Sequence, residues 1–137
     1  SVGLPFVIIE LKNRTELENI SINILAVKEL IAQDIQPFIY VYTRDSQEFD
    51  IQGRMLSFAG SLIEDPATGS ANCALAAMLA HYDSKDDSPF SWRIAQGVEM
   101  NRPSILNARA EKRNGTVTGV WIGGESVFVS QGHINVG

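Results

Sequence analysis

Residues 64–71, EDPATGSA, combine the residue types best suited to chemistry in this chain. Two carboxylates precede a proline turn, and three small or hydroxyl residues begin an alanine-rich stretch, in the order Glu64, Asp65, Thr68, Gly69 and Ser70. A helix beginning here leaves about four backbone N–H groups without intrahelical acceptors, and its dipole adds partial positive charge. Gly69 allows close approach to the backbone, and Thr68 and Ser70 add hydroxyl donors. The segment predicts a small-anion site whose natural ligand is a substrate carboxylate.

Helix capping is the alternative interpretation of the same residues. Asp65, Thr68 or Ser70 can accept hydrogen bonds from first-turn N–H groups, as capping residues do in any protein. The residue types alone favour capping. The balance shifts toward a bound anion because many small and polar residues gather at one turn, and because a helix that enters the core needs partners for its free N–H groups.

The element that follows the site is residues 70–82, SANCALAAMLAHY, which are apolar on nearly every side. A helix that is apolar all round is typical of a buried position. Because it is rich in alanine, this helix is also thin, and strands can close around it. The pattern predicts a helix that is buried on all sides.

The other elements are predicted from hydrophobic periodicity and turn residues. An amphipathic helix is expected at residues 21–33, and strands at residues 5–11, 38–43, 50–58 (bounded by Gly60), 91–97, 104–112, 116–124 and 126–136. Residues 83–89 are expected to be a solvated loop. Tight turns are expected at Asn114-Gly115 and at residues 123–125. Many strands and one buried helix predict an α+β fold with the sheet curled around the helix.

Composition narrows the class of protein. The 137 residues are 45% apolar with a net charge of −5, which fits one globular domain and argues against binding nucleic acid or an anionic membrane. No apolar run is long enough to span a membrane. The single cysteine, Cys73, cannot form an intrachain disulfide, and no Cys/His cluster has metal-ligand spacing. The sequence therefore predicts a cytoplasmic protein without a metal.

Residues 64–71 and the alanine-rich helix resemble the signature of the PhzF family, which is similar in fold to diaminopimelate epimerase. Further matches follow in the family's order: residues 3–8 (GLPFVI), 53–55 (GRM), 96–104 (QGVEMNRPS), 117–124 and 127–136. The resemblance covers essentially the whole chain. Two departures bear on substrate choice rather than on membership: Asn101 replaces a common glycine, and Leu56, Ser57 and Phe58 replace Phe-Ala-Pro.

The resemblance implies a diaminopimelate-epimerase-like domain, with a mixed curled sheet or barrel around a central buried helix. It implies that residues 1–137 are the single C-terminal domain of a two-domain protein, whose N-terminal domain carries the catalytic glutamate and the histidine of a Gly-His motif. The intact enzyme would be a cofactor-independent isomerase or epimerase that moves a proton on a small carboxylate-bearing, unsaturated or cyclic substrate.

The resemblance implies that Asp65 is the catalytic acid/base residue. It also implies that Thr68, Gly69 and Ser70 bind the substrate carboxylate. The isolated chain is expected to be inactive, because the catalytic glutamate has no counterpart in it. Expected partners are the substrate, the N-terminal domain and a second copy of the chain. The alternative function is a non-catalytic module that binds a small anion or another protein and keeps the fold.

Other reactive or aromatic residues are interpreted as structural. His81 and His133 have no nucleophile or ligand at a suitable spacing. Cys73 falls one turn into the helix and is expected to fill the core. Trp92 and Trp121 are expected to pack within the sheet.

Overall fold

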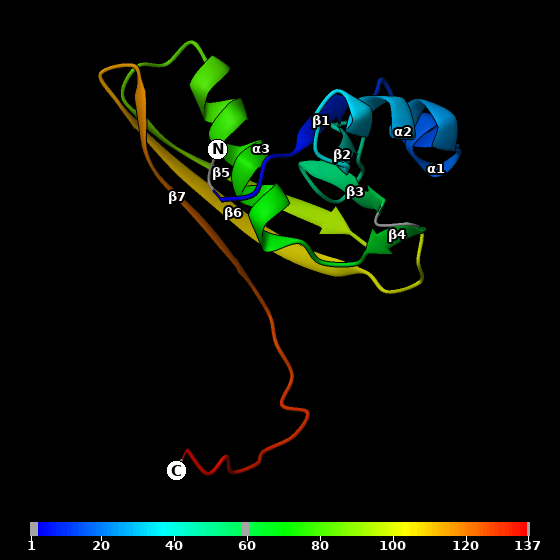
Figure 1. Ribbon diagram of the computed structural model, residues 1–137. Coiled ribbons are helices and arrows are strands. Elements are labelled where there is room, and N and C mark those ends of the chain that lie inside the picture. Colours follow the sequence, from blue (N-terminus) through cyan, green and yellow to red (C-terminus); the bar gives the residue numbers. More distant parts are fainter. Residues whose placement is uncertain (1–2, 59–60, 137) are drawn as a thin grey trace.

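The computed structural model describes residues 3–58 and 61–136 (Figure 1). Its elements, in chain order, are β1 (Val7–Glu10), α1 (Arg14–Glu18), α2 (Ile24–Ala32), β2 (Phe38–Thr43), β3 (Ile51–Phe58), β4 (Leu62–Asp65), α3 (Gly69–Tyr82), β5 (Ser88–Gln96), β6 (Ser104–Arg113) and β7 (Thr116–Gly124). The strands form one seven-stranded sheet, and the expected α+β class is confirmed.

Local signals explain several of these elements. Asn23 begins α2 because its side-chain Oδ1 accepts from the N–H groups of Leu25 and Ala26, at 3.0 and 3.3 Å. Asn114 and Gly115 join β6 to β7 with φ of 48° and 74°, which the tight hairpin turn requires. The predicted bounds of β2 and β7 agree with the structure, and those of β3 and α3 differ by one residue at one end. Gly60, the residue expected to bound β3, lies outside the described residues.

The sheet is mixed, with neighbours in the order β1-β2-β3-β5-β6-β7 and with β4 beside β3. The pairs β1–β2 and β3–β5 are parallel, and the other pairs are antiparallel. One side of β3 is divided between two partners. Residues 51–53 pair with β5, and residues 55–58 pair with β4. This division brings the ends of β4 and β5 together.

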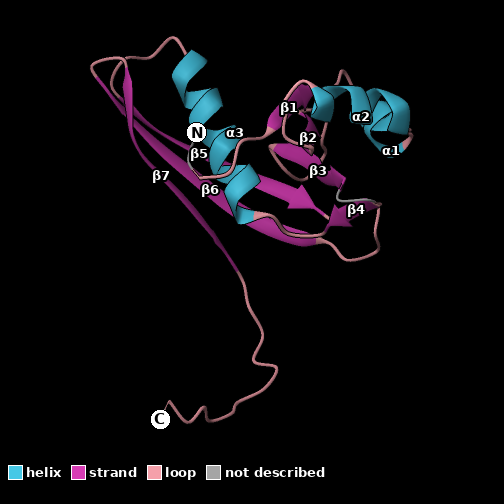
Figure 2. Cartoon of the chain, viewed as in Figure 1, coloured by secondary structure: helices cyan, strands magenta, loops and turns pink. Residues whose placement is uncertain are grey.

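Helices lie on both faces of the sheet. Helix α3 packs over β6 and β7 (Figure 2), and its Leu75 and Ala76 join Ile51, Ile94 and Tyr40 in the main core cluster. Alternate residues of β2 and β3 point to the other face. There Val41 and Leu56 form a second cluster with Leu17 of α1.

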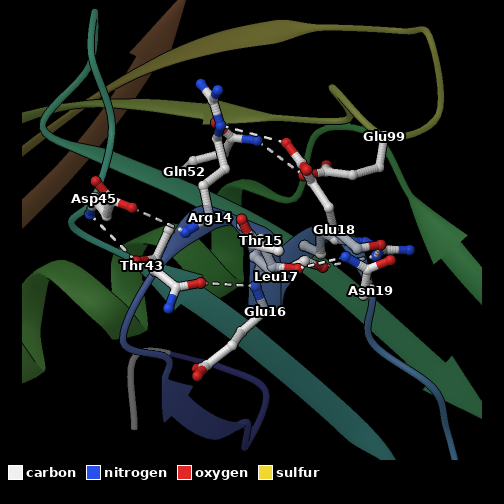
Figure 3. A network of polar contacts seen from close by, with 12 residues as sticks. Arg14, Thr15, Glu16, Leu17, Glu18, Asn19, Thr43, Asp45, Gln52 and Glu99 are labelled. Carbon is white, nitrogen blue, oxygen red and sulfur yellow. Dashed lines mark hydrogen bonds and ion pairs between the residues drawn. The ribbon is translucent and has the colours of Figure 1, made fainter.

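The sequence did not predict α1, a five-residue helix. Polar contacts hold it against the end of β2 (Figure 3). The Arg14 N–H donates to Asp45 Oδ2 at 3.2 Å, and the Asp45 N–H donates to Thr43 Oγ1 at 3.2 Å. Asn13 caps its start by accepting from the Glu16 N–H at 2.9 Å. The Asn13 cap is a local signal, but a helix of five residues is too short to show an apolar repeat.

Helix α3 is not buried on all sides, and the sheet does not curl around it into a barrel. The sheet is open, and the helix lies on one of its faces (Figure 1). Ala71, Leu75, Ala76 and Ala80 are fully buried, whereas the side of the helix that carries Ala74, Ala77 and Met78 is half-buried. Apolar periodicity shows only that a surface suits burial, not that the described strands reach around to cover it. The expectation of a central buried helix is therefore not confirmed.

The expected turn at residues 123–125 and strand at residues 126–136 are wrong. Gly124 is still paired with Leu106 at the end of β7, and residues 125–136 form neither helix nor strand. This segment leaves the sheet and runs away from it (Figure 1). No helix among residues 3–58 and 61–136 is both long and apolar enough to cross a membrane.

Candidate active site

The divided pairing of β3 places Asp65 beside Gln96. Asp65, the last residue of β4, pairs with Met55, and Gln96, the last residue of β5, pairs with Gly53. These two positions, Met55 and Gly53, are two residues apart on β3. The Gln96 side chain therefore lies under the turn that joins β4 to α3, and its Nε2 donates to the Asp65 carbonyl oxygen at 2.7 Å.

Gln96 is fully buried and is the centre of a polar network beneath the start of α3. Its Nε2 also donates to Thr68 Oγ1 at 3.0 Å, and its Oε1 accepts from the Thr68 N–H at 3.3 Å. Asn72, also fully buried, donates from Nδ2 to Gln96 Oε1 and to the Thr68 carbonyl oxygen, both at 2.8 Å. Because each of these buried groups has partners, the network fixes the loop of residues 65–68.

Tyr40 completes the network from β2. Its hydroxyl donates to Asn72 Oδ1 at 2.8 Å. Burial raises the pKa of Tyr40 well above its usual value, against the opposing effect of the Asn72 hydrogen bond. The phenol therefore stays protonated and remains a donor. Gly53 makes this contact possible, because a Cβ atom there would lie 2.7 Å from Tyr40 Cζ and still closer to the hydroxyl.

Replacing Gly53 with alanine is expected to displace the Tyr40 ring and leave Asn72 Oδ1 buried without a donor. The expected cost is about 1–3 kcal/mol in the free energy of unfolding, measured by urea denaturation. Gly123→Ala is the matched control, because a Cβ atom at Gly123 meets nothing within 4 Å. Equal stability of the two variants would show that the network does not depend on the Tyr40 position.

The catalytic candidate, Asp65, is half-buried and faces the helix start. Its Oδ2 accepts a hydrogen bond from Thr68 Oγ1. Because Thr68 also accepts from Gln96, its hydroxyl has one orientation and directs its hydrogen to the carboxylate. The network thus positions Asp65 both through its main chain and through its side chain.

The first turn of α3 offers unused donors. Thr68 is the N-cap, but its side chain makes no capping hydrogen bond. Among the described residues, no acceptor is recorded for the N–H groups of Gly69 and Ser70 or for the Ser70 hydroxyl. A Cβ atom at Gly69 would meet only Ile122, at an ordinary 3.5 Å, so packing does not require glycine there. The side-chain capping that competed with anion binding is therefore not made at Thr68.

A cavity of about 670 Å³ opens next to this turn. Ala67 and Gly69 line it from the helix start, and Leu106, Ile122 and Gly124 line it from the ends of β6 and β7. Three of the four predicted site residues, Asp65, Thr68 and Ser70, are not among its lining residues, although they belong to the same turn. The cavity is large enough for a small molecule that contacts the backbone at Gly69.

Glu64, the other carboxylate of the segment, faces away from this turn. Its two oxygens accept from Arg54 Nε and Nη2 at 2.8 and 2.9 Å. The hydrogen bond to Glu64 raises the pKa of Arg54, whose Nη1 also donates to the Leu17 carbonyl oxygen at 2.9 Å. Glu64 therefore ties β4 to β3 and α1, as a structural ion pair.

Sequence reasoning missed Tyr40, Gly53, Asn72 and Gln96. The available signal was Asn72, a polar residue in an otherwise apolar helix, which indicates a buried partner.

The histidines differ from expectation in their surroundings. His81 is exposed and contacts the Tyr82 ring edge-on, rather than lying in a core, and His133 is in the exposed segment after β7. Cys73 is half-buried, and burial raises the pKa of its thiol.

These features define a class of protein: a mixed sheet with one helix that presents free N–H groups and a positioned carboxylate, suited to holding an anionic substrate and moving one proton. The sequence family described as phenazine biosynthesis-like protein, PhzC-PhzF, matches residues 1–132. The chain belongs to this family, and the resemblance seen in the sequence is confirmed.

Individual relatives agree with the family. An uncharacterized isomerase of Mesorhizobium japonicum, mll1393, is 32% identical over 98% of this chain and 46% of the relative. A trans-2,3-dihydro-3-hydroxyanthranilate isomerase of Pseudomonas chlororaphis is 41% identical over 61% of this chain and 30% of that enzyme. The crystal structure of a Bacillus anthracis phenazine biosynthesis protein of the PhzF family superposes with a TM-score of 0.66 at 22% identity, over 89% of this chain and 45% of that protein. The chain thus spans less than half the length of these relatives.

Proposed function

We propose that this chain supplies one wall of the active site of a PhzF-type isomerase, which moves a proton on a small carboxylate-bearing substrate without a cofactor. The observation that carries the proposal is the pairing of a positioned carboxylate, Asp65, with a helix start whose Gly69 and Ser70 N–H groups are unused. The names of the relatives support isomerase chemistry, because they are isomerases of the same family.

Each residue has a distinct role in this proposal. Gly69 and Ser70 donate their N–H groups to the substrate carboxylate, and the Ser70 hydroxyl adds a third donor. Thr68 orients Asp65 and forms the side of the carboxylate site at the N-cap of α3. Asp65 exchanges a proton with the substrate carbon, because a carboxylate held at one edge of the bound anion can act as acid or base there.

A proton relocation needs two groups, one that removes the proton and one that returns it. Glu64 is held by Arg54, so Asp65 is the one carboxylate at this turn that is available. We propose that the second group is a glutamate on the N-terminal domain of the same protein. That domain closes the cleft over the helix start, and the chain alone does not turn over substrate.

Titration with acetate, benzoate and sulfate, followed by amide chemical shifts, tests the anion site. We expect saturable shifts centred on Gly69 and Ser70. Gly69→Pro removes one N–H group at the first helical position, where proline fits a helix. It is expected to weaken binding by roughly 10- to 100-fold, because a hydrogen bond to a charged group contributes about 1.5–3 kcal/mol.

Ser126→Ala, in the exposed segment after β7, is the matched control and should bind like the parent chain. Shifts that do not saturate, or that are unchanged by Gly69→Pro, would refute the anion site. Saturable binding by a reconstituted two-domain protein that never isomerises a substrate would support the alternative, a non-catalytic anion-binding module.

A further inference from the structure

A cavity separate from the anion site lies at the other end of α3. It has a volume of about 300 Å³ and is bounded by the last turn of α3 and by the ends of β1 and β2. Its walls include Glu10, Tyr42, Arg44, Tyr82, Asp83 and Trp92. Helix α3 has 14 residues, so roughly 20 Å separates its last turn from its first. A small molecule bound in this cavity would therefore leave the helix start free.

The Glu10 carboxylate is held in one orientation at this cavity. Tyr42 is fully buried, and its hydroxyl donates to Glu10 Oε2 at 2.7 Å. Burial, together with this hydrogen bond, raises the pKa of Tyr42 to about 12, so the phenol stays protonated and remains a donor. Glu10 Oε1 also lies 3.1 Å from Arg44 Nε, but both side chains of this ion pair are about half exposed. The buried tyrosine therefore orients the carboxylate, whereas the surface arginine is weakly held.

Aromatic side chains form much of the remaining wall. Trp92 is fixed by stacking on Phe90, with 5.9 Å between the ring centroids and 4° between the ring planes. Tyr82 is 80% exposed, so its ring is accessible to a ligand. Aromatic faces attract a cation through the ring quadrupole, and a carboxylate accepts a charge-assisted hydrogen bond from it. The two kinds of group together are suited to recognising an ammonium ion.

The charges around the cavity also favour a cation. Asp83 adds a second carboxylate, and the C-terminal end of α3 carries the negative end of the helix dipole. Lys112 is buried nearby, but its Nζ donates to the carbonyl oxygens of His81 and Asp83, at 3.1 and 2.8 Å. Arg44 is thus the one basic side chain among the described residues that line the cavity. Because it is exposed, it can turn to solvent when another cation binds the carboxylate.

We propose that this cavity binds a small organic ammonium ion. The ammonium group donates to the Glu10 carboxylate in place of Arg44, and its carbon substituents lie against Trp92 and Tyr82. The cavity volume is at the lower end of the range for ligand sites, which favours an aliphatic or single-ring amine. The inference is independent of the proposed catalytic role, because it uses no residue of the anion site.

Titration of the 137-residue chain with benzylamine, followed by amide chemical shifts, tests the site. Benzylamine is protonated at neutral pH, and benzyl alcohol is a neutral molecule of similar shape. We expect saturable shifts at residues 78–83 with benzylamine and much weaker binding of benzyl alcohol. Glu10→Gln should weaken benzylamine binding by roughly 10- to 100-fold, because a charge-assisted hydrogen bond is lost. Glutamine still accepts from the Tyr42 hydroxyl, so the buried phenol keeps its partner.

Arg44→Gln reports the sign of the ligand charge. It removes the cation that competes for Glu10, so benzylamine should bind about 2- to 5-fold more tightly. Tyr82→Ala removes an aromatic face and should weaken binding by about 2- to 5-fold. Arg14→Gln is the matched control, because it breaks another half-exposed arginine ion pair, with Glu18, that does not line the cavity.

Equal binding of benzylamine and benzyl alcohol, or the lack of any saturable shift at residues 78–83, would overturn the proposal. Unchanged binding by Glu10→Gln would do so too, because the cavity would then recognise the ring rather than the ammonium group. Weaker binding by Arg44→Gln would mean that the cavity selects against a cation. Thermal melting checks that each variant is folded. The Arg44 and Tyr82 variants change exposed side chains, so they decide the outcome even where Glu10→Gln does not fold.

Discussion

Replacing Asp65 with asparagine in the proposed two-domain enzyme is expected to lower kcat by about 100- to 10,000-fold and to change KM little. Asparagine keeps the size of the side chain and can still accept the hydrogen bond from Thr68 Oγ1. It cannot exchange a proton at neutral pH. The loss therefore appears in the step that moves the proton, rather than in substrate binding.

The measurement is turnover of trans-2,3-dihydro-3-hydroxyanthranilate, the substrate that the name of one relative gives, or of another accepted cyclic carboxylate. The comparison is between the chain alone and the chain joined to the proposed N-terminal domain. Glu64→Gln is the matched control, because Glu64 lies next to Asp65 in sequence but is bound to Arg54. Turnover by the chain alone, or full activity of Asp65→Asn in the joined enzyme, would contradict the assigned chemistry.

Lysine substitutions at two neighbouring positions of α3 are expected to differ greatly in stability. Ala76 is fully buried against the sheet, so Ala76→Lys buries a charge without a partner. The expected loss is about 4 kcal/mol or more in the free energy of unfolding, a large part of the total for a domain of this size. Ala77 lies on the half-buried side, where a lysine stem can reach water. The free energy of unfolding of Ala77→Lys is therefore expected to fall by about 1 kcal/mol or less.

Thermal and urea unfolding of both variants measures this difference. Ala76→Ser controls for the change of residue type without a charge. Equal and severe losses at both positions would mean that α3 is covered on all sides in solution. Near-parent stability of Ala76→Lys would mean that the helix does not pack on the sheet as described.

The local pattern of residues was sufficient to predict much of the fold. The β-branched run of β2 and the apolar helix α3 were predicted with nearly their observed bounds, because their residues determine the conformation themselves. The hairpin at Asn114-Gly115 was predicted for the same reason, since its backbone angles require those residues. Asp65 and the start of α3 were located from one continuous segment.

The features that were missed depend on contacts between distant segments. Asn72 and Gln96 are 24 residues apart, and nothing near either of them identifies the other as its partner. Strand β4 exists because β3 offers it an edge. The β-branched and aromatic residues of 126–136 were interpreted as a strand after a turn, but residue types do not specify which edge a strand joins.

The divided pairing of β3 also has a consequence for the order of folding. Gln96 bonds to Asp65 across 31 residues, and the chain between them includes all of α3. Closing so long a loop is slow compared with forming a helix or a local hairpin. The helix α3 and the β6–β7 hairpin can form from local contacts, whereas the carboxylate is positioned only after β3 has accepted both of its partners on one side. Formation of the site would therefore be among the late steps of folding, and a truncated or nascent chain that lacks β5 would have the signature residues without the geometry that they require.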